Sequence, residues 1–283
     1  MSEFIWEKPA FNTELAADAL SQIVREEVLK TGLKRLVLGV SGGIDSALSL
    51  ALAIRALGRE NVLAVFMPYT SSAVSSLADA QALCEKFGVQ NTTVEISPMA
   101  DAYFAKMENI SPARKGNVMA RLRMIVLYDL SFRDAALVLG TSNKTEILLG
   151  YSTLWGDMAS AINPLGDLYK FQVRALSLYL GVTDAILNKA PSADLWQGQT
   201  DETELGFSYA LADFVLYHAI DLGWSEDRIE ANLRSGGVSD TTVVRAILNR
   251  VQKFSFKRQM PVIAKIGSVT IGREFRTPRD WGM

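Results

Sequence analysis

Short apolar runs alternate with helix-like segments through the first half of the chain. Residues 12–30 place their apolar side chains on one face and predict a helix that ends near Gly32. Four apolar runs have the length of buried strands: 35–40, 61–66, 92–96 and 135–140. Helical segments lie between them at 47–57, 73–87 and 115–132. This alternation predicts an α/β fold, with an open, mostly parallel sheet of about five strands covered by helices on both faces.

The pattern becomes helical from about residue 165. Helices are predicted at 170–180, 207–221, 226–234 and 239–253. The sequence contains no repeat, no low-complexity segment and no linker rich in Pro or Gly. We therefore predict one domain over residues 1–283, with a helical C-terminal portion packed on the sheet.

Composition excludes several classes of partner. The 283 residues are 49% hydrophobic and 21% charged, as in an ordinary globular protein, and the net charge of −2 gives no general attraction to nucleic acid or membrane. The longest apolar run, 47–54, is much shorter than the roughly 20 residues that cross a bilayer. The N-terminus does not have the pattern of a secretion signal. We expect a cytoplasmic protein that binds neither nucleic acid nor membrane.

Some residue types are rare or unevenly spread. Cys84 is the only cysteine, which excludes an internal disulfide, and the only histidine, His218, lies in an apolar helix and is expected to be packed there. From residue 250 onwards, eight basic residues outnumber two acidic ones: Arg250, Lys253, Lys257, Arg258, Lys265, Arg273, Arg276 and Arg279 against Glu274 and Asp280. This tail is either a solvated basic face or a clamp for an anionic substrate that carries phosphates.

The strand at 35–40 leads into a loop of eight residues: Gly39, Val40, Ser41, Gly42, Gly43, Ile44, Asp45 and Ser46. The loop lies between a strand and a helix, at the sheet edge where α/β proteins bind ligands, and N–H groups at a helix start attract anions. Asp45 would repel a phosphate unless a divalent cation such as Mg²⁺ lay between them. The loop matches neither GxxxxGK[ST] nor GxGxxG. The alternative is a plain Gly/Ser turn capped by Asp45.

The segment Ser41–Ser46 resembles the SGGxDS loop of ATP pyrophosphatases of the adenine nucleotide α-hydrolase type. In that group the loop holds the pyrophosphate that leaves when ATP adenylates a substrate. Its members include NAD synthetases, GMP synthetases, asparagine synthetases and tRNA-modifying enzymes. The loop alone therefore leaves other adenylating amidotransferases, tRNA-modifying enzymes and a non-catalytic nucleotide-binding module open.

Later segments resemble NAD synthetases, in the order in which that family carries them. They are Gly116–Met124 (GNVMARLRM), Gly140–Glu146 (GTSNKTE), Gly150–Asp157 (GYSTLWGD), Asn163–Leu165, Lys170, Pro191–Leu195, Gln199–Glu202 and Lys257–Arg258. Taken singly, a residue such as Asn117 could be a helix cap and Arg121 a surface charge. The ordered set, which extends over about residues 12–279, favours the functional interpretation.

The resemblance implies ATP-dependent amidation of nicotinic acid adenine dinucleotide (deamido-NAD) to NAD. The reaction would pass through an adenylated intermediate, use ammonia and release AMP and pyrophosphate. The implied ATP contacts are residues 39–46, Thr141, Lys170 and Ser192, with Asp45 and Lys170 catalytic, and Asp45 and Glu146 holding Mg²⁺. The implied deamido-NAD contacts are Asn117, Arg121, Glu146, Tyr151, Ser152, Thr153, Leu154 and Lys257.

Three positions depart from the short, ammonia-using members of the family. Leu154, Ala161 and Phe256 stand where those members have Lys, Asp and His, and there the chain is more similar to the long glutamine-dependent type. Glutamine hydrolysis requires an activated thiol, and one cysteine and one histidine in core helices do not provide it. We therefore expect free ammonia as the nitrogen donor, with a separate glutaminase subunit as the alternative. The family also implies a homodimer, for which the helices at 12–30 and 115–132 offer apolar faces.

Overall fold

Four parallel strands form the sheet of the computed structural model, which describes residues 4–192, 200–271 and 274–275. Their order is β3 (Gln90–Thr93), β2 (Val62–Phe66), β1 (Arg35–Gly39) and β4 (Ala136–Val138). The register pairs Leu38 with Ala64 across β1 and β2, and Val37 with Val138 across β1 and β4. The predicted α/β class with a parallel sheet is confirmed.

The sheet has four strands in the described part of the chain, where about five were expected. Next to β4, a single parallel bridge joins Leu139 to Ile162. The backbone N–H of Ala161 donates to Val138 O at 2.9 Å, and that of Gly140 donates to Ile162 O at 2.7 Å. Pro164 follows two residues later and has no N–H to donate, so this pairing does not extend into a full strand.

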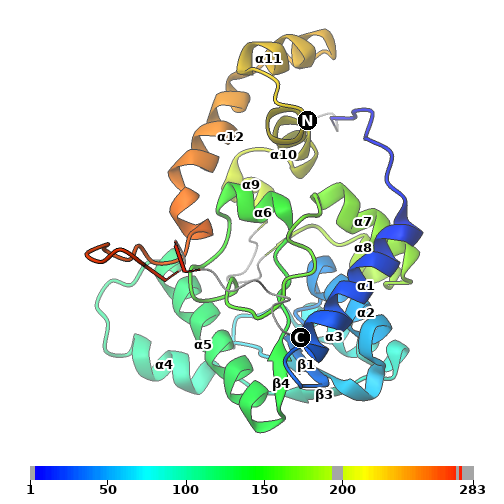
Figure 1. The fold of residues 1–283 in the computed structure, drawn as a ribbon, viewed down its shortest axis with the longest axis vertical. Coiled ribbons are helices and arrows are strands. Elements are labelled where there is room, and N and C mark those ends of the chain that lie inside the picture. The colour runs from blue at the N-terminus through cyan, green and yellow to red at the C-terminus, as the bar shows by residue number, and fades with distance from the viewer. Residues whose placement is uncertain (1–3, 193–199, 272–273, 276–283) are drawn as a thin grey trace.

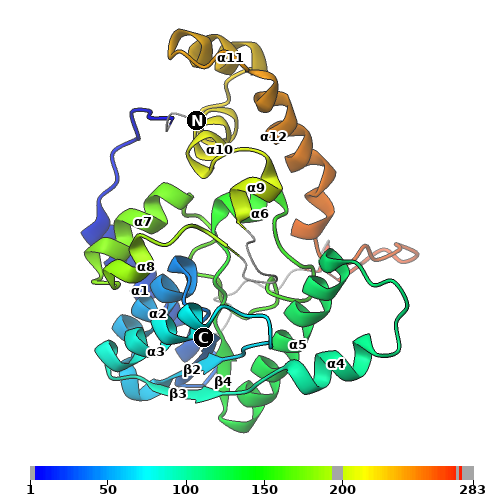
Figure 2. The same cartoon turned by 180° about the vertical axis from the view of Figure 1, so that it is seen from behind.

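Helices cover both faces of the sheet (Figures 1 and 2). On one side lie α1 (Thr13–Leu29), α2 (Ile44–Leu57), α3 (Val74–Phe87) and α8 (Asp184–Leu187), and on the other α4 (Ser97–Phe104) and α5 (Pro112–Arg133). Alternate residues of β1 show why both faces are covered. Leu36 and Leu38 pack with α1 and α2, whereas Val37 packs with α5. The run at 35–40 is apolar throughout because both faces are buried.

A helical layer follows the sheet in sequence and lies above it in Figure 1. It comprises α6 (Lys144–Leu149), α9 (Asp201–Leu205), α10 (Tyr209–Leu216), the π-turn η2 (Tyr217–Asp221), α11 (Glu226–Ser235) and α12 (Thr242–Lys253). Between the layers lies α7 (Lys170–Tyr179), and the 3₁₀ turns η1 (Arg59–Asn61) and η3 (Ser255–Arg258) complete the described elements. The helical layer has its own apolar cluster, which includes Phe214, Leu216 and Ile247. The predicted helical C-terminal portion is thus present, while its membership of a single domain stays a prediction.

Several predicted boundaries shift. The helix expected at 47–57 begins at Ile44, so the end of the Gly/Ser loop forms the first helical turn. The strand expected at 92–96 lies at Gln90–Thr93, because it is an exposed, polar edge strand without an apolar run to mark it. The short helices α4, α6, α8 and α9 were not predicted.

Among residues 4–192, 200–271 and 274–275, no helix combines the length and hydrophobicity that a bilayer crossing requires. The cytoplasmic location and the absence of a nucleic-acid partner stay predictions.

Candidate active site

A cavity of about 870 Å³ opens at the carboxyl ends of the strands. Its walls are formed by the Gly/Ser loop, the ends of β2 and β4, one side of α5, the segment 150–157 and the start of α7, with Arg250, Phe254 and Lys257 from the C-terminal region. Of the predicted site residues, all but Arg121 and Leu154 line it. The structure therefore brings segments that are more than 200 residues apart in sequence to one cavity of the size that small-molecule sites have.

The Gly/Ser loop is a tight turn at the start of α2. Gly42 has φ +81°, and a Cβ there would lie 2.1 Å from the carbonyl oxygen of Ser76, so only glycine fits. Ser46 Oγ donates to Gly43 O at 3.0 Å and accepts from the N–H of Ser41 at 3.2 Å. The two serines thus stabilise the turn itself. The first N–H groups of α2, which have no intrahelical partners, lie beside the cavity and suit an anion.

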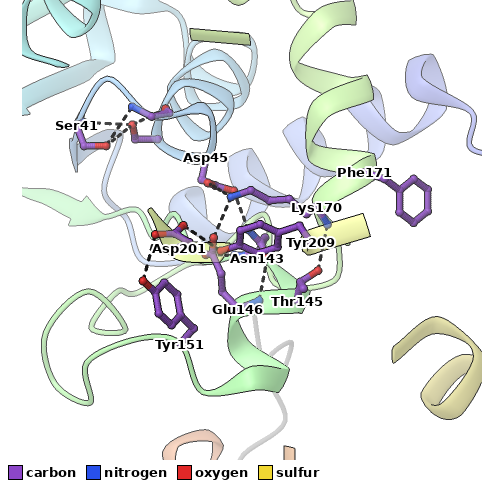
Figure 3. Close-up of polar contacts among 12 residues, drawn as sticks. Ser41, Asp45, Asn143, Thr145, Glu146, Tyr151, Lys170, Phe171, Asp201 and Tyr209 are labelled. Carbon is purple, nitrogen blue, oxygen red and sulfur yellow. Dashed lines mark hydrogen bonds and ion pairs between the residues drawn. The ribbon is translucent and has the colours of Figure 1, made fainter. Parts of the chain in front are cut away.

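Lys170 lies between two carboxylates (Figure 3). Its Nζ is 2.6 Å from Asp45 Oδ2 and 3.0 Å from Glu146 Oε1, and the three side chains are 11–20% exposed. The amide of Asn143 donates to the other oxygen of Asp45 at 2.8 Å. A cation at this point is therefore shared by two acidic groups that come from α2 and α6.

Burial and mutual charge perturb this group strongly. Burial and the charge of Asp45 raise the pKa of Glu146 to about 7, although the Lys170 ammonium opposes the shift. Burial lowers the pKa of Lys170, but the charges of Asp45 and Glu146 outweigh burial and keep it above its usual range. Lys170 thus stays protonated, and the two carboxylates compete for one positive charge.

A capping box explains how Glu146 reaches the site. Asn143 Oδ1 accepts from the N–H of Glu146 at 3.0 Å, and Glu146 Oε2 accepts from the N–H of Asn143 at 3.3 Å. The tetrapeptide Asn-Lys-Thr-Glu therefore starts α6 and holds the carboxylate at the helix start. Glu146 thus both stabilises the start of α6 and lies beside Lys170.

A buried carboxylate of α10 fixes the first turn of α7. The N–H of Lys170 donates to Thr145 Oγ1 at 3.1 Å, and the Thr145 hydroxyl donates to Asp213 Oδ1 at 2.6 Å. Asp213 Oδ2 accepts from the N–H of Phe171 at 2.8 Å. Asp213 is fully buried, and burial raises its pKa to about 6 against these hydrogen bonds. Three helices thus meet at Asp213, which the sequence analysis did not select.

The segment 150–157 is braced from two sides. Lys257 Nζ donates to Gly150 O at 2.8 Å and to Ser152 O at 2.5 Å. From α5, Arg121 donates to Leu154 O at 3.1 Å. Arg121 and Leu154 lie outside the cavity lining, so Arg121 bonds to the chain that forms the wall; their contact with a substrate stays a prediction.

The hydroxyl of Thr153 donates to Asn117 Oδ1 at 2.8 Å, which ties the same segment to α5. Of the predicted ATP contacts on later segments, Thr141 and Ser192 also line the cavity. The segment that follows Ser192, residues 193–199, lies outside the described residues and includes part of the matching motifs.

The basic tail divides into different roles. Arg250 and Lys257 line the cavity, which agrees with a clamp for an anion at these two positions. Arg258 instead donates to the carbonyl oxygens of Leu148 and Val251. Lys265 pairs with Glu274. Arg273, Arg276 and Arg279 lie outside the described residues.

Neither Cys84 nor His218 lines the cavity. Cys84 belongs to α3 and is fully buried in the core, and burial raises its pKa to about 11. His218 packs against Phe214 and Trp224 and donates from Nδ1 to Phe214 O at 2.7 Å. The expected packing role of each is confirmed by this placement.

The cavity also contains polar residues that the sequence analysis missed. Asp201 and Glu204 of α9, Arg123 of α5 and Lys189 after α8 line it. Asp201 and Glu202 belong to a matched segment, which was a signal, but no role was attached to either residue.

Comparisons with known proteins agree with the site. The family model described as NAD synthase matches residues 16–261. The chain is 51% identical over 270 residues to the NH3-dependent NAD+ synthetase of Chlorobium phaeovibrioides, covering 95% of this chain and 96% of that protein.

Two solved structures are also similar. One is the NH3-dependent NAD synthetase from Campylobacter jejuni, with a TM-score of 0.75 and 36% identity over 90% of this chain and 100% of the other. The second is the NMN synthetase from Francisella tularensis, with a TM-score of 0.78 and 32% identity over 90% of this chain and 99% of the other.

Proposed function

Because this chain belongs to the NAD synthase family, we propose that its cavity amidates deamido-NAD to NAD with ATP and ammonia. The chain is an enzyme of this family, and the relatives that match it over nearly their whole length are named as NH3-dependent. The observation that carries the proposal for the site is the position of Lys170. It lies between Asp45 of the Gly/Ser loop and Glu146, which is close to the segment 150–157.

The reaction needs an activated carboxyl group, since a carboxylate has no good leaving group for an attacking amine. In the first step the nicotinate carboxylate attacks the α-phosphorus of ATP. An acyl-adenylate forms, the bond between the α- and β-phosphates breaks, and pyrophosphate leaves. In the second step ammonia attacks the acyl carbon, AMP leaves, and the nitrogen loses a proton to give the amide.

The residues of the cavity suit the first step. The N–H groups at the start of α2 and the Lys170 ammonium would stabilise the charge of the departing pyrophosphate. Their position is fixed before substrate binds, by the Ser41 and Ser46 turn and by the Thr145–Asp213 contact. Preorganised donors of this kind are the main source of stabilisation in such transfers.

Asp45 and Glu146, which share the single ammonium of Lys170, fit a site for Mg²⁺. Among the described residues no group of three or more His, Cys, Asp or Glu side chains could hold a metal. Mg²⁺ commonly takes one or two carboxylates together with substrate phosphates, so Asp45 and Glu146 would hold it when ATP is bound. The raised pKa of Glu146 supports this, because it shows that one ammonium does not fully balance the two carboxylates. A second positive charge would keep both carboxylates ionised. The chemistry that Mg²⁺ supplies when bound is neutralisation of phosphate charge.

The second step needs little from the protein beyond access for ammonia. Cys84 is buried and does not line the cavity, which supports free ammonia as the nitrogen source, with a separate glutaminase subunit as the alternative. A homodimer, implied by the family, remains part of the proposal. It is supported by the exposed Ile125, Tyr128 and Phe132 of α5.

Product analysis tests the function. Purified protein with deamido-NAD, Mg-ATP and ammonium should form NAD, AMP and pyrophosphate in equal amounts. ADP and phosphate as products would refute adenylation, and pyrophosphate exchange that requires xanthylate or tRNA would favour a different adenylating enzyme. ATP binding without turnover of any carboxylate would favour a non-catalytic module. The acid form of NMN belongs in the same assay, because one similar structure is an NMN synthetase.

A further inference from the structure

One buried carboxylate connects two walls of the cavity. Asp201, the first residue of α9, lines the cavity and is 5% exposed. Its Oδ1 accepts from the hydroxyl of Tyr151 and its Oδ2 from the hydroxyl of Tyr209, both at 3.1 Å (Figure 3). Each oxygen is thus used to hold one tyrosine, and the two rings cannot move independently.

Tyr209 supports the ammonium of Lys170. The Lys170 Nζ lies 4.7 Å from the centroid of the Tyr209 ring, within the range of a cation–π contact. Burial, with the charges of Glu146 and Asp201, raises the pKa of the Tyr209 hydroxyl far above its usual value. The hydroxyl therefore remains a donor to Asp201, and this hydrogen bond fixes the ring beneath the lysine.

Tyr151 belongs to the opposite wall. Its N–H donates to Glu146 O at 2.9 Å, so the residue directly follows the end of α6 and begins the segment 151–157. The single proton of its hydroxyl is shared between Asp201 Oδ1 and Glu204 Oε2, which lies at 2.9 Å. Burial and the charge of Asp201 raise its pKa, which keeps this hydroxyl protonated as well.

We propose that Asp201 is a positioning residue of the amidation, because its carboxylate sets Lys170 and the Tyr151 wall relative to each other through the two tyrosine hydroxyls. The proposal rests on the proposed function, in which Lys170 meets the phosphates of ATP and Tyr151 meets deamido-NAD. A misplacement of about 1 Å between such groups costs on the order of a hundredfold in rate, so a shared anchor has a large effect without touching the reacting atoms.

Steady-state kinetics of Asp201→Asn, Tyr209→Phe and Tyr151→Phe test this role. Tyr209→Phe keeps the ring but loses the hydroxyl that bonds to Asp201. It should lower kcat about tenfold with an unchanged KM for deamido-NAD. Tyr151→Phe should raise the KM for deamido-NAD about tenfold with little change in kcat. Asp201→Asn should show both defects. Adding either Phe substitution to Asp201→Asn should then cost less than about twofold more, because the charged acceptor with two oxygens that the hydroxyls share is already lost.

The matched control is Tyr69→Phe. Tyr69 also donates to a carboxylate, Asp101 Oδ1 at 2.7 Å, but does not line the cavity, so both kinetic parameters should stay within about twofold of the parent. If Asp201→Asn does not fold, as judged by thermal unfolding, the double variant Tyr151→Phe/Tyr209→Phe replaces it and should combine both defects.

The outcomes separate the two proposals. An Asp201→Asn enzyme with kcat and both KM values within about twofold of the parent would overturn the positioning role, as would full additivity of its effect with the Phe substitutions. For the double Phe variant, unchanged parameters would have the same meaning. A parent protein that forms no NAD would instead refute the proposed function.

Discussion

The backbone N–H of Lys170 donates to the side chain of Thr145 at 3.1 Å, so the neighbour of Glu146 in α6 sets the first turn of α7. The Thr145 hydroxyl passes this restraint to Asp213 in α10. Asp45, Glu146 and Lys170 meet at the cavity. The hydrogen bonds of Thr145 and Asp213, buried in the helical layer, fix the helix ends that carry Glu146 and Lys170.

Asp213→Asn should change how stability depends on pH. Burial raises the pKa of Asp213 to about 6 in the folded protein, above its ordinary value of 3.8, so the folded state binds the proton more tightly. Stability from this group is therefore lost as pH rises from about 4 to about 6, by about 3 kcal/mol in total. Asn cannot ionise, so the variant should lack this loss.

Urea unfolding of both proteins across this range measures the difference. Asp240→Asn is the control, because hydrogen bonds from Thr242 lower the pKa of this exposed carboxyl and its contribution is complete at lower pH. Parallel curves for parent and Asp213→Asn between about pH 4.5 and about pH 7 would contradict the prediction.

Asp45→Asn should lower kcat by at least about a hundredfold, the scale of losing one charge-stabilising group. The substitution removes the closer of the two carboxylates on Lys170 and one of the two proposed ligands of Mg²⁺. Asp18→Asn, which removes a surface partner of Arg55, is the control and should be fully active. Near-normal turnover of Asp45→Asn at limiting Mg²⁺ would show that the metal assignment is wrong.

Gly42→Ala should abolish turnover and destabilise the protein, since the added Cβ would meet Ser76 O at 2.1 Å in a left-handed backbone. Gly237→Ala is a matched control. Its φ is +86°, but a Cβ there would meet nothing within 4 Å, so it carries the backbone strain without the clash. Thermal unfolding and NAD formation should separate the two variants. Equal losses in both would mean that strain alone is responsible.

Cys84 should be unreactive in the folded protein. Its pKa of about 11 leaves almost no thiolate at about pH 8, and the side chain is fully buried. Iodoacetamide should label it only after denaturation, and the protein should form NAD with ammonium but fail with glutamine alone. Glutamine-driven synthesis that Cys84→Ala abolishes would contradict this. Glutamine use only after addition of a separate amidase would identify a partner subunit.

The proposed homodimer should depend on α5. Phe132 is 92% exposed, and Ile125 and Tyr128 are exposed on the same helix. Ile125→Glu/Phe132→Glu should shift the protein to a monomer in light scattering. Val74, which is 86% exposed on α3, provides the control Val74→Glu, which should stay dimeric. A parent protein that is monomeric and fully active would refute the proposed homodimer.

The local parts of the site could be predicted from the sequence. Ser41–Ser46 lies between a strand and a helix, and the hydrogen bonds of its two serines are made within the loop, so the local sequence located it. Glu146 and Lys170 were found through resemblance, because each alone has an ordinary role at a helix start. Their meeting at 3.0 Å depends on the packing of both α6 and α7 on α10.

Asp213 and Asp201 could not be found in this way. Asp213 lies in an apolar helix, and only the approach of α6 and α7 turns it into a hydrogen-bond acceptor. Asp201 begins a five-residue helix and acts on tyrosines at positions 151 and 209, which tertiary contacts alone bring together. The expected fifth strand is reduced to one bridge between Leu139 and Ile162 in the described residues, and Pro164, which follows, has no N–H to donate.

The bonds from Lys257 to Gly150 and Ser152 have a consequence for how the protein is made. They join positions more than 100 residues apart, and contacts of such separation form late because the intervening loop must first be closed. A nascent chain that has emerged only as far as α11 would contain the whole sheet and the Gly/Ser loop but not this brace. Catalytic competence should therefore appear only after the sheet has folded and Lys257 has emerged, in one step and not gradually.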